Sequence, residues 1–366
     1  MHKKIILLVT MLLLTAPFPG ICESHSIKVV FLNPGNPDEN ATGSFWLNVT
    51  RFMEAAANDL DIELVTIYAH RNHILMKKQA REILEYKPHY VILVNEKASA
   101  LPLIKQITAH DIPVFMLLNT LDKKDLALLS EKEKTLLCGS LIPNNYIAGK
   151  KLLNGLVKIY ELLPDKLSTK TQRNLLALQG DYNTQASIAR EQGLLDALHK
   201  NKQLTYVDSS VANWSKELAY EKVKGILKRT QINIIWAAND AMAFGAKQAV
   251  MESNLPYPII IGGVNWDIKD RHYPVNLSFG GHVSLGAMSL VMLKDINENS
   301  LPKNKRYQVV DIFESNISPY YQPFIKRLYE NALEQYDFLK FSHSTVNRLP
   351  FSIENLDKVY EHSNKK

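Results

Sequence analysis

Short β-branched segments alternate with longer amphipathic segments along most of this chain. Residues 45–60, FWLNVTRFMEAAANDL, carry apolar side chains every three to four positions, which is typical of a helix with one buried face. Strand followed by helix, repeated many times, favours an α/β fold in which helices cover both faces of parallel sheets. Eight segments have the composition and length of strands, namely residues 27–33, 62–68, 89–95, 114–119, 174–180, 204–210, 232–239 and 258–265.

This many strand–helix units exceed what one compact sheet with ordinary crossovers accommodates, so we expect two lobes. The border is expected in CGSLIPNNYIAG, residues 138–149, after the first set of units. At 46% apolar residues, the chain can bury a core of the required size. From about Ser318 the alternation stops, and a helix-like segment over 320–339 is followed by a polar tail.

The first 24 residues have the three-part pattern of a secretory signal. A basic start, MHKK, precedes an apolar run over residues 5–16, and helix breakers and small residues follow. The run is too short to span a bilayer, which requires about 20 residues. We expect cleavage after Cys22 or Ser24 and export to the periplasm. Lipid modification of Cys22 is the alternative, which the large Ile21 before it disfavours.

Cysteine content and charge exclude several other classes of protein. Only Cys138 remains once the signal is removed, so no internal disulfide is expected and a large core must stabilise the exported protein. The formal net charge of +6 is mild for this length, and no dense Lys/Arg block with interleaved aromatic residues occurs. Nucleic acid is therefore not an expected partner. No segment after the signal is long and apolar enough to predict a membrane helix.

Five of the expected strands end on the same residue type. Any one of these asparagines suits the N-cap of the next helix. Ser and Thr cap nearly as well, however, and neither occurs at any of these five strand ends. The carboxyl ends of parallel strands meet at one edge of a sheet, where ligands bind. Carboxamides both donate and accept hydrogen bonds, which suits a ligand rich in hydroxyl groups. The five are Asn33, Asn95, Asn119, Asn239 and Asn265.

Two acidic residues belong to the same predicted site. Glu96 directly follows Asn95, and Asp240 directly follows Asn239 at the start of the helical segment AMAFGAKQAV. Of Asn239 and Asp240, we expect one to cap this helix and the other to bind the ligand.

Aromatic side chains complete the prediction. Phe45 and Trp46 open the helix after the first strand, where an aromatic face can stack on the C–H face of a sugar. Packing of Trp46 in the core is the alternative, since the two rings cannot share one narrow helical stripe. Trp214, in the loop VANWSK, is a second candidate for such an aromatic wall.

Arg190 and His282 are the remaining candidates. Arg190 lies in IAREQG, inside the expected helix after LALQGDYNTQ, and His282 lies in SFGGHVSLG just before an apolar helix. Each has an ordinary alternative, a solvated arginine for the first and a surface or capping histidine for the second.

Several of these motifs resemble the type I periplasmic solute-binding proteins, the ribose-binding-protein-like group. The resemblance covers about residues 25–315 and rests on NP…FW, AREQG, AANDAMAFGAKQAV and IIGGVN. It implies that Arg190 binds the ligand. Asn265 stands where the family usually has a carboxylate, and the Gly281–His282 pair stands where glutamine is common. These departures imply a ligand other than ribose.

The resemblance also implies two Rossmann-like lobes joined by three crossovers, near 141–145, 279–282 and 303–308. The expected division places a signal peptide in 1–24, lobe 1 in 25–141 and 281–305, lobe 2 in 142–280 and 306–315, and a C-terminal helical extension with a polar tail in 316–366. That extension exceeds the usual end of the family, and it could dock on a partner, brace the lobes or be loosely ordered.

The function that the resemblance implies is capture of a small sugar or polyol by hinge closure, for delivery to an ABC permease in the membrane. A monomer without cofactor, metal or catalytic groups is expected. Signalling to a membrane sensor kinase or cyclase is the alternative, because both kinds of partner would read the closed lobes. A transcription repressor is disfavoured, since a secretory signal occupies the end where its DNA-binding helices would lie.

A hydrolase is the minor alternative. The chain has no Gly-rich phosphate loop, no G-x-S-x-G and no H-E-x-x-H motif. Asp240 and His282 could form an acid–base pair, but no nucleophile that they would activate is evident in the sequence.

Overall fold

The first of two six-stranded sheets contains the N-terminal strands. The structure is a computed structural model that describes residues 26–164, 173–267 and 272–360, so the predicted signal peptide lies outside the described residues. The strand order is β11-β5-β4-β3-β1-β2, and all the pairs are parallel. The strands are β1 (Ile27–Asn33), β2 (Ile62–Tyr68), β3 (Tyr90–Leu93), β4 (Val114–Leu117), β5 (Leu137–Pro143) and β11 (Tyr307–Val310).

The second sheet repeats this arrangement, with the order β12-β10-β9-β8-β6-β7. Its pairs are parallel except for β12, which lies antiparallel to β10 at the edge. Its central strands are buried on both faces, as expected of a sheet covered by helices. The strands are β6 (Arg173–Gln179), β7 (Leu204–Val211), β8 (Ile234–Ala237), β9 (Ile260–Asn265), β10 (Leu277–Gly280) and β12 (Glu314–Ser315).

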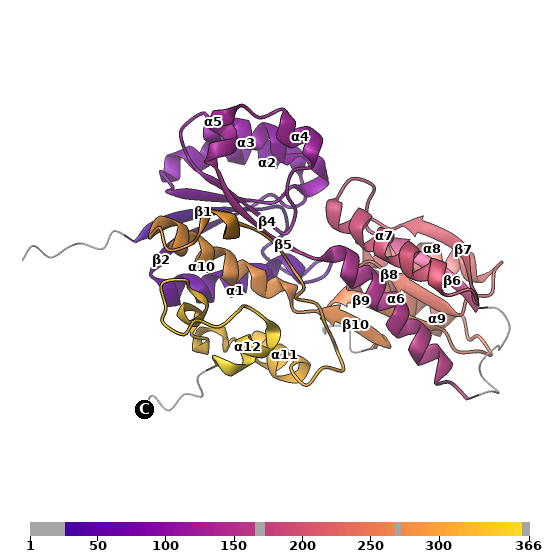
Figure 1. Cartoon of the computed structure of the whole chain (residues 1–366). Helices are drawn as coiled ribbons and strands as arrows, with labels where there is room; N and C mark the ends of the chain where they lie inside the picture. The colour runs from indigo at the N-terminus through magenta and orange to yellow at the C-terminus, as the bar shows by residue number, and fades with distance from the viewer. Residues whose placement is uncertain (1–25, 165–172, 268–271, 361–366) are drawn as a thin grey trace, which may run out of the picture.

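Helices cover both faces of each sheet, and each sheet with its helices forms one of two lobes (Figure 1). Lobe 1 comprises the first sheet with α1 (Phe45–Leu60), α2 (His73–Glu82), α3 (Ala100–Thr108), α4 (Lys123–Ala127), α5 (Glu131–Leu136) and α10 (Leu285–Asn297). Lobe 2 comprises the second sheet with α6 (Asn145–Glu161), α7 (Gln185–Lys200), α8 (Lys216–Leu227) and α9 (Asp240–Glu252). The predicted α/β class with two lobes is confirmed, and all eight predicted strands and the predicted helix over 45–60 form.

The chain passes between the sheets at three places before the C-terminal extension. These passages follow β5, β10 and β11, at residue 144, residues 281–284 and residues 311–313. The prediction for the last passage, near 303–308 with 306–315 in lobe 2, is wrong. Strand β11 pairs with β5 and therefore belongs to lobe 1. It is an edge strand whose Val309 is exposed, so its short sequence lacks the apolar run of a central strand.

The C-terminal extension, residues 316–360 where described, is folded against lobe 1. It contains α11 (Tyr321–Tyr329), two 3₁₀ turns and α12 (Ile353–Lys358). The helix-like segment 320–339 is helical only in its first half, because the chain turns at Asn331, which has a φ of 55°. The buried Phe338 and Phe341 show that the extension is packed rather than loosely ordered.

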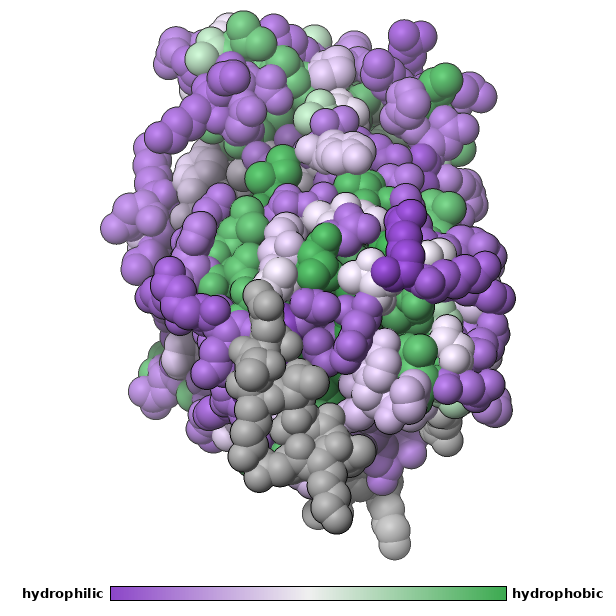
Figure 2. All heavy atoms as spheres, turned by 90° about the vertical axis from the view of Figure 1, so that its right-hand side faces the viewer, coloured by the Kyte–Doolittle hydropathy of each residue, from purple (hydrophilic) through white to green (hydrophobic). Residues whose placement is uncertain are grey.

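Hydrophilic side chains predominate on the face at the lobe 2 end of the molecule, with apolar side chains interspersed among them (Figure 2). Within the described residues, no helix combines the length and apolar character that a membrane crossing requires.

Candidate ligand-binding site

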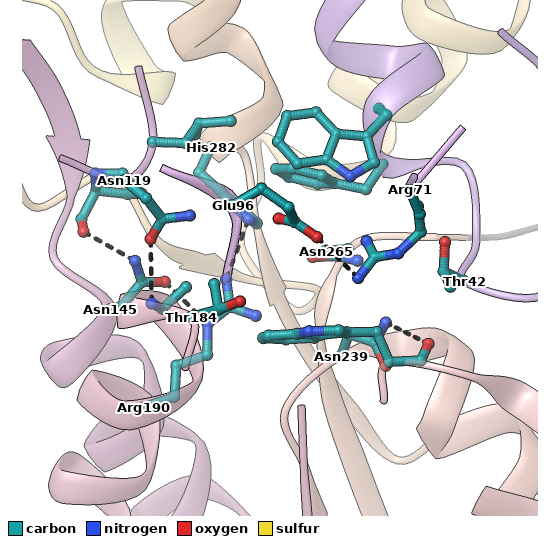
Figure 3. Close-up of a pocket in the computed structure, with 16 residues that line it drawn as sticks. Thr42, Arg71, Glu96, Asn119, Asn145, Thr184, Arg190, Asn239, Asn265 and His282 are labelled. Atoms are coloured by element: carbon teal, nitrogen blue, oxygen red, sulfur yellow. Dashed lines mark hydrogen bonds and ion pairs between the residues drawn. The ribbon is translucent and has the colours of Figure 1, made fainter. Parts of the chain in front are cut away.

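A cavity lies between the two lobes, at the carboxyl ends of strands from both sheets (Figure 3). It contains about 570 Å³ of empty space, including its mouth. Its lining comprises Thr42, Phe45, Trp46, Arg71, Glu96, Leu118, Asn119, Pro143, Asn145, Thr184, Ala186, Arg190, Trp214, Asn239, Asn265 and His282.

Nine of the twelve predicted site residues therefore lie together around one cavity. They come from both lobes and from segments far apart in the sequence. These nine are Phe45, Trp46, Glu96, Asn119, Arg190, Trp214, Asn239, Asn265 and His282.

Two of the five strand-end asparagines do not line the cavity. The Asn33 side chain accepts a hydrogen bond from the Gly35 backbone N–H at 2.8 Å and donates to Thr50 Oγ1 at 3.0 Å. The Asn95 side chain accepts from the backbone N–H of Ala100, at the start of α3, at 3.0 Å. Both side chains bond to local groups, and only Asn95 reaches the start of a helix as the capping alternative expects. The ligand-binding prediction finds no support in their positions.

Asn239 and Asp240 divide their roles differently from the prediction. Asn239 Oδ1 accepts from the Met242 backbone N–H at 2.9 Å, so Asn239 caps α9 while it also lines the cavity. Asp240 is fully buried behind the wall, where it accepts from Ser278 Oγ at 2.7 Å and from the Asp267 backbone N–H at 3.0 Å. The expectation that the second residue of this pair binds ligand therefore does not hold, because Asp240 is directed into lobe 2.

Arg190 is held in the wall by groups that carry no negative charge. It projects from α7 and is 4% exposed. Its Nε donates to Asn145 Oδ1 at 2.9 Å and its Nη1 donates to the Ala238 carbonyl oxygen at 2.5 Å. Burial lowers the pKa of Arg190 to about 9, and the nearby Asp240 opposes this shift. The guanidinium is therefore still charged at neutral pH, in an orientation that its partners determine.

His282 lies beside Arg190 as a neutral ring. Arg190 Nη2 lies 3.3 Å from His282 Nε2, which therefore serves as the acceptor. Burial, reinforced by the charge of Arg190, lowers the pKa of His282 well below its usual value. The ring packs against Phe45 and Phe313, at centroid distances of 4.9 and 4.5 Å. An acid–base pair of His282 with Asp240 is not formed, because Asp240 is bonded to Ser278 and Asp267 instead.

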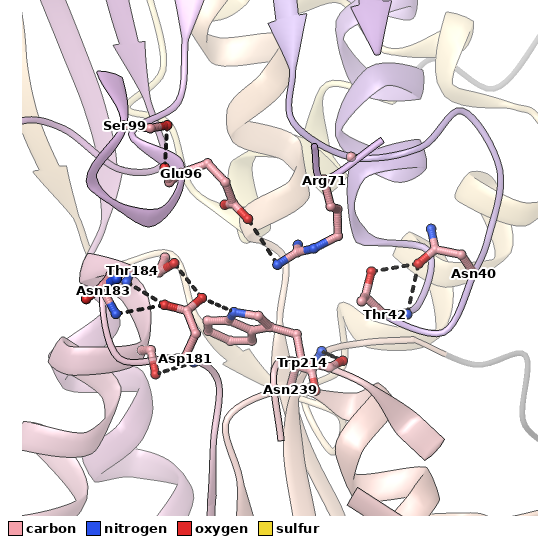
Figure 4. A network of polar contacts seen from close by, with 12 residues as sticks. Asn40, Thr42, Arg71, Glu96, Ser99, Asp181, Asn183, Thr184, Trp214 and Asn239 are labelled. Atoms are coloured by element: carbon pink, nitrogen blue, oxygen red, sulfur yellow. Dashed lines mark hydrogen bonds and ion pairs between the residues drawn. The ribbon is translucent and has the colours of Figure 1, made fainter. Parts of the chain in front are cut away.

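Aromatic rings lie on both walls. In lobe 1, Phe45 and Trp46 meet edge to face at 5.0 Å, and Trp46 covers Gly35, so this ring belongs to the core as well as to the cavity. In lobe 2, Trp214 Nε1 donates to Asp181 Oδ2 at 2.6 Å (Figure 4). Burial favours protonation of Asp181, but hydrogen bonds from Thr184 and Trp214 outweigh it and lower the pKa of this carboxyl group. Asp181 is therefore a charged acceptor, and its hydrogen bond fixes the orientation of the Trp214 ring.

An ion pair that the sequence analysis missed lies in the lobe 1 wall. Arg71 Nη2 is 3.0 Å from Glu96 Oε1, and the two side chains point toward each other (Figure 4). Burial raises the pKa of Glu96, and Arg71 opposes that shift. Arg71 follows β2 in AHRNH, so its position just after a strand end was a usable signal.

Hydrogen bonds between the lobes flank the cavity. On one side, the Lys216 backbone N–H donates to the Ala41 carbonyl oxygen at 2.9 Å, and Ser44 Oγ donates to Asp267 Oδ1 at 2.8 Å. On the other side, the Ala186 backbone N–H donates to Asn119 Oδ1 at 3.1 Å. The lobes are thus in a closed arrangement.

The loop after β9 is strained where it meets the cavity. Asn265 and Trp266 have φ values of 144° and 63°, and such conformations cost roughly 1–3 kcal/mol each for residues other than glycine.

Two buried carboxyl groups lie next to this loop. Burial raises the pKa of Asp240 to about 8, with Asp267 adding to the effect, and burial raises the pKa of Asp267 to about 6. Among the described residues, no cluster of three His, Cys, Asp or Glu could hold a metal ion.

The family follows from a match over most of the two lobes. A family model described as a periplasmic binding protein domain matches residues 37–269, more than half of the chain. The chain belongs to this family of periplasmic binding proteins. The predicted resemblance to the ribose-binding-protein-like group is thereby confirmed.

Individual relatives differ in how much of this chain they match. The crystal structure of a periplasmic sugar-binding protein from Pseudomonas fluorescens is similar over 90% of this chain and 99% of that one, with a TM-score of 0.77 and 28% identity. The xylitol-binding protein of Mycolicibacterium smegmatis is 25% identical over 57% of this chain and 55% of its own length. The galactofuranose-binding protein of Escherichia coli is 26% identical over 42% of this chain and 45% of its own length. The chain thus spans about half the length of these two curated relatives.

Proposed function

We propose that this protein is an extracytoplasmic binding protein that captures a small sugar or polyol by closure of its two lobes. The observation that carries the proposal is a cavity between the lobes in which a buried arginine, three carboxamides of the predicted set and aromatic rings on both walls face one space. Names of relatives support the ligand class, since these proteins are described as binding xylitol, galactofuranose or sugar.

The mechanism is binding without chemistry. Arg190 donates to ligand hydroxyls, Asn119, Asn239 and Asn265 supply amide groups, and Trp46 and Trp214 pack against the apolar faces of the ligand from opposite lobes. Hydrogen bonds that involve charged groups contribute roughly 1.5–3 kcal/mol each, so three or four support micromolar binding, about −8 kcal/mol, after ordering costs. Only contacts made in the closed state, such as those to both walls at once, drive closure.

Delivery to an ABC permease is the role that we propose for the closed form, with the protein exported to the periplasm as a monomer. The predicted signal in residues 1–24 supports export. A membrane sensor is the alternative partner. Deleting the protein distinguishes the two roles: loss of ligand uptake supports delivery, whereas loss of a transcriptional response with uptake intact supports sensing.

A thermal-shift screen of aldoses, pentitols, inositols and furanoses tests the ligand class. A binder at a hundred times its Kd is expected to stabilise the protein by about 2.7 kcal/mol. Isothermal titration calorimetry then gives the Kd, and mass spectrometry of the recovered ligand checks that it is unchanged. The proposal fails if no carbohydrate stabilises the protein, if the recovered ligand has been converted, or if the shift by the best ligand survives Arg190→Ala and Trp214→Ala.

A further inference from the structure

The C-terminal extension makes the chain cross between the lobes once more. After β12, which belongs to the lobe 2 sheet, residues 316–320 return to lobe 1, and α11 then lies beside α1 (Figure 1). Phe324 of α11 stacks on Phe52 of α1 at a centroid distance of 5.2 Å. Tyr336 also stacks on Phe52, at 6.2 Å.

Hydrogen bonds attach the extension to lobe 1. Asp295 of α10, which is fully buried, accepts from Ser342 Oγ at 2.5 Å and from the His343 backbone N–H at 2.8 Å. Asp59 of α1 accepts from the Phe338 backbone N–H at 2.8 Å. These contacts join backbone and side chains at two separate helices, so the extension moves with lobe 1.

One residue of lobe 2 inserts into this extension. The Trp266 ring meets the rings of Tyr321 and Phe324, neighbours on one face of α11, edge to face at 5.2 and 5.3 Å, and it is 1% exposed. We call the pair Tyr321 and Phe324 the aromatic notch. Trp266 remains bound to its own lobe, because its Nε1 donates to the Ser278 carbonyl oxygen at 3.3 Å.

The same loop reaches the cavity. Asn265 lines the cavity, Trp266 fills the aromatic notch, and Asp267 accepts from Ser44 of lobe 1. Asn265 and Trp266 both have positive φ values, so the backbone keeps an unfavourable conformation in which consecutive side chains point to these different partners.

We infer that the C-terminal extension is a brace that holds the lobes together through Trp266. The extension is attached to lobe 1, and the notch grips a residue of lobe 2 next to the cavity. Opening the lobes moves Trp266 away from the notch, so the brace favours the closed arrangement and limits the opening of the empty protein. Ligand at Asn265 and Trp266 in the notch favour the same state, and they are therefore coupled. The inference rests on the proposed function for ligand affinity only, and not for the lobe motion.

Tyr321→Ala tests the brace, because it removes one wall of the notch. Phe351→Ala is the matched control, since Phe351 is also half-buried and meets one ring edge to face, Phe341 at 5.0 Å, inside the extension. Spin labels at Lys124→Cys and Gln192→Cys, exposed positions in lobe 1 and lobe 2, report the interlobe distance in the full-length protein without ligand.

Tyr321→Ala is expected to lower the ratio of closed to open molecules about two- to tenfold, the range for one aromatic pair, and to lengthen the interlobe distance. Phe351→Ala and Tyr321→Phe are expected to retain the wild-type distribution. Tyr321→Leu, which keeps apolar volume without the ring, replaces Tyr321→Ala if that variant does not fold. A wild-type distance distribution in the notch variant, or an equal change in the Phe351→Ala control, overturns the inference.

The affinity experiment is separate. If the screen gives a carbohydrate ligand, the notch variant is expected to weaken its Kd by the same factor as the closed population falls. If the screen finds no ligand, the proposed function fails while the distance measurement still decides on the brace. A Kd that is unchanged despite a shifted distance distribution overturns the coupling of the notch to the cavity.

Discussion

The lobe 2 wall of the cavity is held more rigidly than the lobe 1 wall. In lobe 2, Arg190 is bonded to Asn145 and to a backbone carbonyl, and Asp181 fixes Trp214. Apart from the contact of Arg190 with His282, which lies in the passage between the lobes, these contacts are made within lobe 2. The wall is therefore organised before the other lobe closes over a ligand, which lowers the ordering cost of binding.

The lobe 1 wall is built from a packed aromatic pair and an ion pair. Phe45 and Trp46 lie at the start of α1, where Trp46 also contributes to the core. The side chains of Arg71 and Glu96 are 19% and 10% exposed, and they bond to each other rather than to a fixed backbone group. We therefore propose that lobe 2 orients the ligand, whereas lobe 1 covers it and adapts to it.

Replacing Arg190 is expected to have the largest effect on this comparison. Arg190→Ala removes a buried cation with several donors, and we expect the Kd for the screened ligand to weaken about 100-fold or more. Arg190→Lys keeps the charge but loses the planar fork, so it is expected to recover little of the affinity. Calorimetry measures both, with the exposed Arg81→Ala on α2 as the control. A Kd within twofold of wild type for Arg190→Ala would contradict an orienting role of lobe 2.

The buried carboxyl pair behind the lobe 2 wall gives a prediction about pH. The pKa values of Asp240 and Asp267 are raised to about 8 and about 6 in the folded protein, above those of the unfolded chain. The folded state thus binds more protons, so the stability it gains is complete at low pH and is lost as the pH rises toward 8. We expect the free energy of unfolding to fall steadily as the pH rises from 5 to 8.

Asp240→Asn tests the source of this dependence. The amide keeps an oxygen that can accept from Ser278 but cannot ionise, so the decline of the free energy of unfolding with pH is expected to become shallower. Urea unfolding at several pH values measures the effect, and the exposed Glu85→Gln serves as the control. Equal slopes for wild type and Asp240→Asn would show that other groups determine the pH dependence.

Trp214 is expected to have the next largest effect. Trp214→Ala removes an aromatic wall and leaves Asp181 without its indole donor, so we expect the Kd to weaken about tenfold. Trp214→Phe keeps a ring without the hydrogen bond and separates the two contributions. Trp46→Ala is the comparison from lobe 1, and it is expected to lower Tm as well, because Trp46 also packs over Gly35. A larger loss of affinity for Trp46→Ala than for Trp214→Ala, in folded protein, would reverse the assignment of the walls.

Local pattern predicted the sheets well and the cavity in part. Strand β1 begins and ends as predicted because its apolar run is continuous and bounded by polar residues, whereas the exposed edge strand β11 has no such pattern. Strand-end position alone could not separate Asn119, which faces the cavity, from Asn95, which accepts a hydrogen bond from the first backbone N–H of α3. That choice depends on which backbone N–H groups lie within reach. Asn145 was missed because its role requires Arg190, 45 residues later, at its side.

The Arg71–Glu96 ion pair is expected to give the smallest effect. Arg71 keeps 19% of its side chain exposed and the two members act as a unit, so Glu96→Gln and Arg71→Ala are each expected to change the Kd about two- to fivefold, with the double variant no worse than the sum of the two. The matched control is Lys78→Ala with Glu82→Gln, an exposed ion pair on α2 at 3.3 Å. Calorimetry at low and high salt measures the cycle. If Glu96→Gln weakens binding as much as Arg190→Ala does, the adaptable wall carries the binding energy, and lobe 1 rather than lobe 2 orients the ligand.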